Sequence, residues 1–172
     1  MKEIYLAGGC FWGTQKFVDQ FDGVLETTVG YANGKAERPS YEDVCHRDTG
    51  HAETVRIRYD ENILPTQTLL RYYFMTIDPL SVNRQGGDFG TQYRTGIYYT
   101  DRSLIADISK VIGEETDKAG RSLAVEVKPL ENFWEAEDYH QKYLDKNPGG
   151  YCHVPLDMIR WAMTADPSEY LQ

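Results

Sequence analysis

The chain has 172 residues, of which 41% are hydrophobic, a size and composition typical of one globular domain rather than of a disordered chain. Its 18 Lys and Arg against 27 Asp and Glu give a net charge of −9, which excludes nucleic acid as the main partner because such binding needs a basic face. No apolar run approaches the roughly 18 residues that span a bilayer, and the N-terminus lacks the pattern of a signal peptide. We therefore expect a cytoplasmic protein with no membrane partner.

Strand-like and helix-like segments alternate along the chain. In chain order, the hydrophobic patterns predict strands over residues 4–7, 24–31, 51–59, 94–99 and 123–128, and helices over residues 11–21, 40–45, 66–77, 103–118, 135–146 and 156–165. Ser40 followed by Asp43 is typical of a helix cap. Residues 78–92 are polar and glycine-rich, and loops of that length are usually functional or disordered. The alternation predicts an α+β fold, a two-layer α/β sandwich with a mixed β-sheet, formed by a single domain over residues 1–172.

Three cysteines are an odd number in a chain without an export signal, which excludes a disulfide-stapled secreted scaffold. Cys10 lies after a strand and a Gly-Gly break, at the entrance of a predicted helix. Backbone N–H groups there favour an anion, so we expect the helix to lower the pKa of this thiol. Phe11 and Trp12 follow directly and can form an apolar box beside it. The alternative is that Cys10 is a small buried hydrophobe among core aromatics.

Glu53 shares the parity of Val55, Ile57 and Tyr59 in the strand over residues 51–59, which places a carboxyl group on the apolar face. An unpaired buried carboxyl group keeps its proton to a high pH, as a general acid needs near neutrality. The alternative is a solvated position at the strand's frayed start.

Other arrangements of these residue types point to different chemistry. The sequence His51-Ala52-Glu53 matches one half of the zinc deaminase signature, but the P-C-x-x-C half is absent, and without any C-x-x-C or H-x-x-x-H spacing we expect no metal. The missing C-x-x-C also excludes a thioredoxin-type motif. A cysteine hydrolase, with Cys10 served by His51, His140 or His153, stays open. So does a non-catalytic peptide-binding module with an aromatic groove.

Three polar residues in predicted loops complete the candidates: Tyr41, Asp88 and Tyr93. Tyrosine hydroxyls donate hydrogen bonds without adding charge, which suits binding of a polarised oxygen beside an apolar pocket. With 13 tyrosines in the chain, any single one is more often a packing residue.

Four blocks in order carry a specific resemblance. They are Gly9-Cys10-Phe11-Trp12-Gly13, Gly50-His51-Ala52-Glu53, Gly90-Thr91-Gln92-Tyr93-Arg94 and Lys146-Asn147-Pro148-Gly149-Gly150-Tyr151-Cys152. Together they resemble the A-type peptide methionine sulfoxide reductases, and the match runs from about residue 3 to residue 152. The resemblance implies a ferredoxin-like core and thiol-dependent reduction of methionine-S-sulfoxide, free or in damaged proteins.

The resemblance also implies roles for the cysteines. Cys10 matches the nucleophile, which is converted to a sulfenic acid by its attack on the sulfoxide. Glu53 matches the acid that protonates the sulfoxide oxygen. Cys152 becomes the resolving cysteine, carried on a mobile C-terminal tail over residues 147–172, and forms a transient disulfide with Cys10. Cys45 matches a position without a catalytic role.

The remaining implied roles concern the substrate and the reductant. The residues expected to bind substrate are Phe11 and Trp12 for the methyl group, Tyr41 and Tyr93 for the oxygen, and Asp88 as a further carboxylate contact. The expected reductant is thioredoxin, with a potential of about −270 mV. We expect a monomer with no metal, flavin or nicotinamide cofactor.

Overall fold

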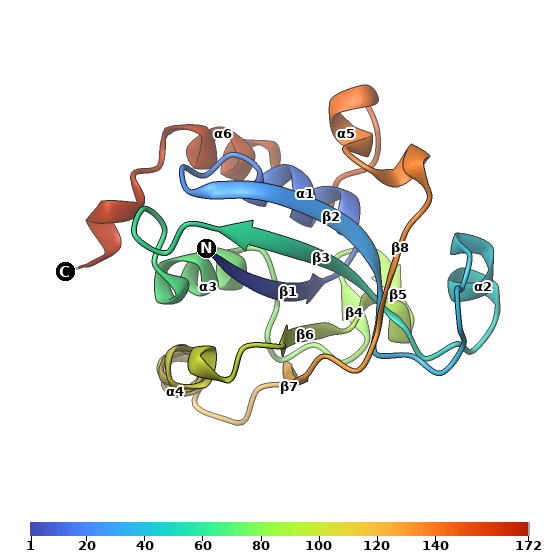
Figure 1. Cartoon of the computed structure of the whole chain (residues 1–172), viewed down its shortest axis with the longest axis horizontal. Helices are drawn as coiled ribbons and strands as arrows, with labels where there is room; N and C mark the ends of the chain where they lie inside the picture. Colours follow the sequence, from blue (N-terminus) through green and yellow to red (C-terminus); the bar gives the residue numbers. More distant parts are fainter. Residues whose placement is uncertain (172) are drawn as a thin grey trace.

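The protein is described here from a computed structural model, which defines residues 1–171. A six-stranded sheet runs through the molecule in the order β7-β6-β1-β3-β2-β8 (Figure 1). Its strands are β1 (Lys2–Gly8), β2 (Val24–Ala32), β3 (Ala52–Tyr59), β6 (Thr95–Tyr99), β7 (Glu126–Pro129) and β8 (Phe133–Glu135). Neighbouring strands are antiparallel except for β6 and β7, which are parallel. The sheet is therefore mixed, as the sequence predicts.

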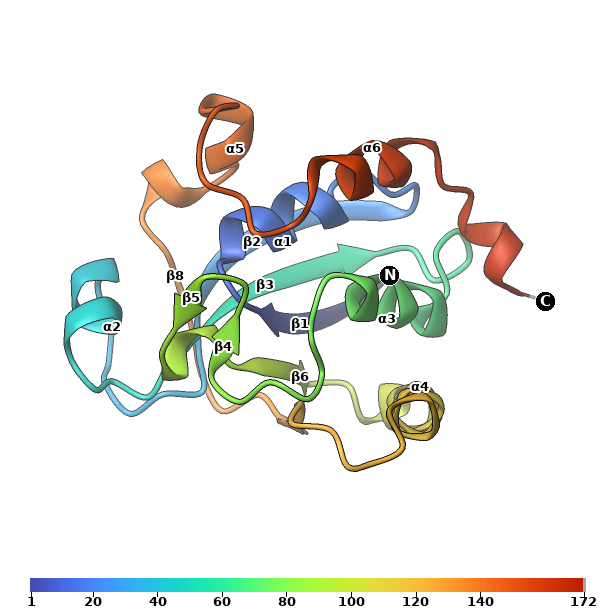
Figure 2. The same cartoon turned by 180° about the vertical axis from the view of Figure 1, so that it is seen from behind.

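The helices are α1 (Phe11–Val18), α2 (Tyr41–His46), α3 (Thr66–Met75), α4 (Ile105–Ala119), α5 (Tyr143–Lys146) and α6 (Leu156–Thr164). Helices α1 and α3 pack on this sheet and connect its central strands, and further helices surround them. The order β1-α1-β2, then β3-α3-β6, with central strands arranged β6-β1-β3-β2, is the ferredoxin-like core expected from the sequence. Both views place α6 beside α1 and α4 beside α3 (Figures 1 and 2).

The apolar core lies between the sheet and these helices. Val55, Ile57 and Tyr59 of β3 are all fully buried and pack with Phe17 of α1 and Leu69 of α3. Burying side chains of this size stabilises the fold by roughly 1.5–3 kcal/mol each. The alternation that the sequence shows in this strand is therefore the alternation between the core and the other face of the sheet.

Several local predictions are confirmed. Ser40 and Asp43 form a reciprocal capping box at the start of α2, where Asp43 N–H donates to Ser40 Oγ at 3.1 Å. The loop over residues 78–92 contains structure that the sequence did not reveal: a short hairpin of β4 (Arg84–Gln85) and β5 (Asp88–Phe89), followed by a 3-10 turn at Thr91–Tyr93.

The predicted helix over residues 135–146 is wrong. The chain forms β8, a 3-10 turn at Asp138–His140 and the four-residue helix α5 instead. The polar side chains of this segment bind the body of the protein rather than lining a solvated helix face. Gln141 exchanges hydrogen bonds with both backbone groups of Val29 in β2, and Lys142 Nζ donates to Asp19 at 2.6 Å. These tertiary contacts override the local helical pattern.

Helix α6 fixes the last part of the chain to the core. Ile159 and Ala162 are buried, and Trp161 packs edge-on against Phe21 at a ring separation of 6.0 Å. Cys152 lies before this helix, in the connection from α5. Within residues 1–171, no helix combines the length and the apolar character required to cross a membrane.

Candidate active site

Cys10 is the N-cap residue of α1, directly after the turn that ends β1. Gly9 makes this turn with φ of +87°, and a Cβ there would lie 2.9 Å from Cβ of Gln85, so a larger residue does not fit. The Cys10 side chain is 7% exposed. The sequence therefore places this thiol correctly at a helix entrance, and the structure adds that it is almost covered.

Glu53 lies on β3 next to this turn and is 1% exposed. Its Oε1 accepts a hydrogen bond of 3.1 Å from the backbone N–H of Phe11, while Oε2 is buried without a hydrogen-bond partner. Burial raises the pKa of this carboxyl group to about 8, with the Phe11 N–H opposing the shift and Asp88 adding to it. Glu53 is therefore predominantly protonated at neutral pH, and Oε2 is the oxygen free to carry the proton.

The predicted lowering of the Cys10 pKa is wrong. Burial raises the pKa of this thiol well above its ordinary value, and a charge on Glu53 raises it further. The N–H groups of Trp12 and Gly13 act in the predicted direction, but they are outweighed. In the resting site, Cys10 is therefore a neutral thiol beside a neutral carboxyl group.

Aromatic rings form one wall of the site. Trp12 is half-buried and stacks on Tyr143, with ring centroids 3.7 Å apart and an interplanar angle of 12°. Its Nε1–H donates to Nδ1 of His140 at 2.9 Å. Phe11 is buried, and its ring centroid lies 5.7 Å from that of Tyr31. This wall is apolar and held in place by both stacking and hydrogen bonding.

Tyr41 and Tyr93 come from α2 and from the 3-10 turn after β5, and both are half-buried. Burial raises the pKa of each hydroxyl, and a charge on Glu53 contributes to both shifts. A charge on Glu53 also raises the pKa of the Cys10 thiol. Cys10, Tyr41 and Tyr93 therefore all lie near the carboxyl group of Glu53. Cys45 lies one helical turn along α2 and also raises the pKa of the Tyr41 hydroxyl.

Cys152 reaches the site from the segment between α5 and α6. A Cβ added to Gly13 would lie 3.2 Å from Sγ of Cys152, so the second thiol packs directly on the first turn of α1. The thiol donates to the carbonyl of Val154 at 3.3 Å, and burial raises its pKa. The hydroxyl of Tyr151 donates to Oδ2 of Asp88 at 2.9 Å. The structure thus brings all eight predicted residues to the same end of the sheet.

Sequence reasoning named His140 as a candidate base for Cys10, but it did not find the role of His140 in holding Trp12, and it did not find Tyr143 or Glu137 at all. His140 and Tyr143 hold Trp12, and Glu137 accepts hydrogen bonds from the Tyr31 hydroxyl at 2.9 Å and from the Tyr41 N–H at 3.1 Å. All three fall in the segment predicted as one regular helix. Their spacing carries no signal of these partners, which lie about a hundred residues earlier in the chain.

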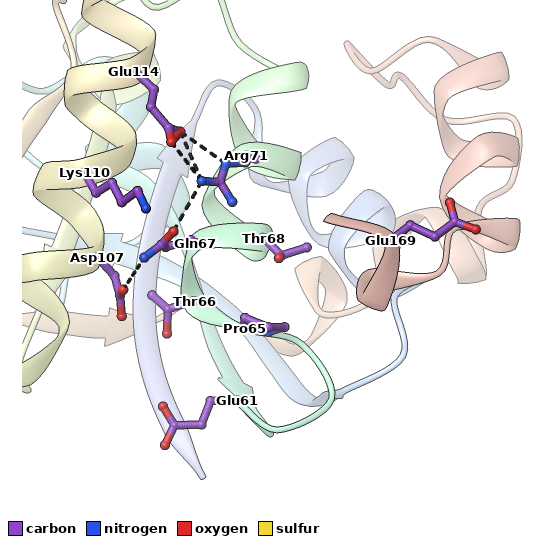
Figure 3. A pocket seen from close by; sticks show the side chains of 10 residues that line it. All are labelled: Glu61, Pro65, Thr66, Gln67, Thr68, Arg71, Asp107, Lys110, Glu114 and Glu169. Carbon is purple, nitrogen blue, oxygen red and sulfur yellow. Dashed lines mark hydrogen bonds and ion pairs between the residues drawn. The ribbon is translucent and has the colours of Figure 1, made fainter. Parts of the chain in front are cut away.

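A separate polar cavity of about 620 Å³ lies between α3 and α4 (Figure 3). Two of its charged side chains form an ion pair, Arg71 with Glu114 at 2.9 Å, and the amide of Gln67 donates to Asp107 at 2.7 Å. None of the residues predicted from the motifs lines this cavity. Its lining residues include carboxyl groups, but neither a thiol nor an aromatic side chain of the kind that the site at Cys10 contains.

All three cysteines are free thiols. Cys10 caps the start of α1, next to an uncharged carboxyl group that can donate a proton and to an apolar wall, and Cys152 packs on the first turn of the same helix. This combination defines a thiol-dependent oxidoreductase acting on a substrate with an apolar group and a basic oxygen.

Comparison with known proteins makes the assignment specific. The family model described as peptide methionine sulfoxide reductase matches residues 2–169, and the chain belongs to this family. It is 58% identical to the peptide methionine sulfoxide reductase MsrA of Lachnoclostridium phytofermentans over 89% of this chain and 92% of that protein. The reduced form of Mxr1 from Saccharomyces cerevisiae matches with 39% identity and a TM-score of 0.84, covering 90% of this chain and 91% of Mxr1. Mxr1 in complex with Trx2 matches with 24% identity and a TM-score of 0.55, over 83% of this chain and 84% of that one.

Proposed function

We propose that this protein repairs oxidised methionine by reducing methionine-S-sulfoxide, free or in proteins, with Cys10 as nucleophile, Glu53 as proton donor and Cys152 as resolving thiol. The observation that carries the assignment of the site is Glu53. This carboxyl group is 1% exposed and has a pKa of about 8, so it keeps its proton at neutral pH and can donate it to a sulfoxide oxygen. The activity is that of the family to which the chain belongs.

The first step transfers one oxygen and two electrons. Oε2 of Glu53 gives its proton to the sulfoxide oxygen while Sγ of Cys10 attacks the sulfoxide sulfur. The oxygen then forms a bond to Sγ of Cys10 as the S–O bond of the substrate and the transient bond between the two sulfurs break, so that the oxygen ends as the hydroxyl of a sulfenic acid on Cys10. The proton of the Cys10 thiol replaces the one that Glu53 gave up. Methionine leaves, and the carboxyl group is restored for the next cycle.

The substrate is positioned by groups with complementary chemistry. The fixed ring of Trp12, stacked on Tyr143 and hydrogen-bonded to His140, offers an apolar surface for the S-methyl group. The ring of Phe11, which also contacts His140, adds to this surface. The hydroxyls of Tyr41 and Tyr93 donate to the sulfoxide oxygen. Asp88 accepts a hydrogen bond from the substrate's backbone in place of the one it accepts from Tyr151.

The second step forms a disulfide. Sγ of Cys152 attacks Sγ of the Cys10 sulfenic acid, the hydroxyl leaves as water, and one S–S bond replaces two S–H bonds over the whole cycle. Within the predicted tail, the connection between α5 and α6 is the segment that delivers Cys152, with Gly149 and Gly150 supplying the freedom that this movement needs.

Thioredoxin is the proposed reductant of this disulfide. Cys152 lines a surface groove of about 630 Å³ together with apolar side chains that include Leu156, Ile159 and Met163, and this groove gives a dithiol protein access to Sγ. The complex of the yeast relative with Trx2 supports the same partner. A thioredoxin-dependent cycle fits the cytoplasm, where thiols are kept reduced. It requires no metal, flavin or nicotinamide in this chain, and a monomer supplies every residue of the site.

The test compares the two sulfoxide diastereomers. With thioredoxin and its reductase as electron source, the protein should reduce a peptide methionine-S-sulfoxide and leave the R form untouched. The Cys10→Ser variant should be inactive toward both, while Cys45→Ser keeps the activity and serves as the matched control. Equal rates on the two diastereomers, or an active Cys10→Ser variant, would contradict the proposal.

A further inference from the structure

His153 directly follows the second thiol of the site, and its imidazole is inserted beside the turn that carries Cys10. Its Nε2 lies 3.2 Å from the position that a Cβ of Gly9 would occupy, and its Nδ1 lies 2.8 Å from the corresponding position at Gly13. Glycine at both positions leaves the space that the ring fills. The imidazole therefore spans the two glycines on either side of the Cys10 segment.

Both ring nitrogens of His153 are shielded from solvent, and within residues 1–171 no side chain hydrogen-bonds to either of them. The carbonyl of Gly8 is the one backbone group that acts on the ring as an acceptor, so at least one nitrogen is left without a partner. Burial lowers the pKa of the imidazole, with Asp88 and the carbonyl of Gly8 opposing the shift. At neutral pH the ring is therefore neutral, with one nitrogen that can accept a proton and one that can donate. An unpaired buried polar group is costly, and such groups in native structures call for an explanation.

The disulfide-forming step needs a group of this kind. Cys152 must lose its proton to attack, yet burial raises the pKa of this thiol. Among residues 1–171, the thiol donates to the carbonyl of Val154, which cannot take a proton. Sγ of Cys152 and Nδ1 of His153 lie within 3.2 Å and 2.8 Å, respectively, of the same point, the Cβ position of Gly13. The opposite nitrogen, Nε2, lies on the Gly9 side, next to the residue that would carry the sulfenic acid.

We propose that His153 is the acid–base residue of disulfide formation. One ring nitrogen takes the proton of the Cys152 thiol as Sγ attacks Sγ of the Cys10 sulfenic acid. The other nitrogen gives a proton to the departing hydroxyl, which leaves as water. One S–H and one S–O bond break, one S–S bond and one O–H bond form, and the imidazole ends neutral. This inference rests on the proposed function and assigns the proton transfers of its second step.

The test separates the two steps in single turnovers without reductant. Methionine formation is followed by quenched flow, sulfenic acid by dimedone trapping, and disulfide formation by the loss of free thiols. His153→Phe keeps a ring between the two glycines but has no nitrogen, whereas His153→Ala leaves a space that added imidazole can enter. His46→Phe is the matched control, because His46 is 74% exposed and does not contact the site.

We expect both His153 variants to form methionine at the wild-type rate and to accumulate trappable sulfenic acid. Disulfide formation should slow about a hundredfold, the lower end of what general acid–base catalysis contributes. Added imidazole should restore the rate in His153→Ala and not in His153→Phe. Disulfide formation at the wild-type rate in His153→Phe, or failure of imidazole to act on His153→Ala, would overturn this inference. A wild-type protein that forms no methionine would instead overturn the proposed function.

Discussion

Replacing Glu53 by Gln is the most informative change at the site, because it removes one proton and keeps the shape of the side chain. With a pKa of about 8, the carboxyl group is protonated in about nine-tenths of the molecules at pH 7. An amide cannot protonate the sulfoxide oxygen. We expect single-turnover methionine formation to slow by about 10²–10⁴-fold, which is the usual contribution of a general acid. That factor corresponds to roughly 3–5 kcal/mol of activation free energy.

The pH profile distinguishes loss of an acid from loss of packing. Burial raises the pKa of Glu53 from 4.5 to about 8, so the reactive protonated form persists through neutrality and is lost as the pH rises through 8. Methionine formation by the wild-type protein should fall above that pH. In Glu53→Gln this decline should be absent, and the small remaining rate should not follow this titration.

A second carboxylate serves as the control for this experiment. Glu126 is half-buried in β7, but Arg94 and Tyr98 donate to it and lower its pKa, so it is ionised throughout the same range. Glu126→Gln should leave the decline near pH 8 in place. A Glu53→Gln protein that forms methionine within threefold of the wild-type rate, or that keeps the decline, would refute the reasoning.

Three further predictions concern the same region. Gly13→Ala adds a Cβ that would lie 2.8 Å from His153 Nδ1 and 3.2 Å from Cys152 Sγ. In a single turnover, we therefore expect disulfide formation to slow and the rate of methionine formation to stay unchanged. A change in both rates would contradict this prediction. Cys45→Ser should leave the number of thiols lost per turnover unchanged by thiol titration, whereas a reduced number would make Cys45 part of the relay. Glu53 should also affect the free energy of unfolding. Its raised pKa contributes stability that is complete below pH 4.5 and is lost as the pH rises through 8. In urea unfolding, the free energy of unfolding of the wild type should therefore fall by about 4 kcal/mol relative to that of Glu53→Gln between pH 5 and 9. An unchanged difference would show that the carboxyl group is solvated.

The parts of the site that sequence predicts well are those with a local cause. The period-two alternation of β3 identifies Glu53 as a buried carboxyl group because strand geometry alone decides which face a side chain occupies. The capping box at Ser40 follows from a spacing of three residues. The break at Gly9 similarly places Cys10 at a helix entrance.

Other features depend on contacts between distant segments and leave no local pattern. The Cys10 thiol has a raised pKa because the folded chain buries it, and this burial outweighs the helix N–H groups that the sequence does predict. Residues 135–146 have a helical pattern, but Gln141 and Lys142 bind β2 and Asp19, and the segment bends to reach them. The contact of His140 with Trp12 is a consequence of that bend.

The proposed catalytic cycle depends most directly on the pairing of Cys10 with Cys152 during turnover. Mass spectrometry after a single turnover with methionine sulfoxide and no reductant tests it. We predict that the protein loses two hydrogens, that peptide mapping places the new disulfide between Cys10 and Cys152, and that Cys45 stays free. Formation of one methionine per protein with all three thiols still free would contradict the account.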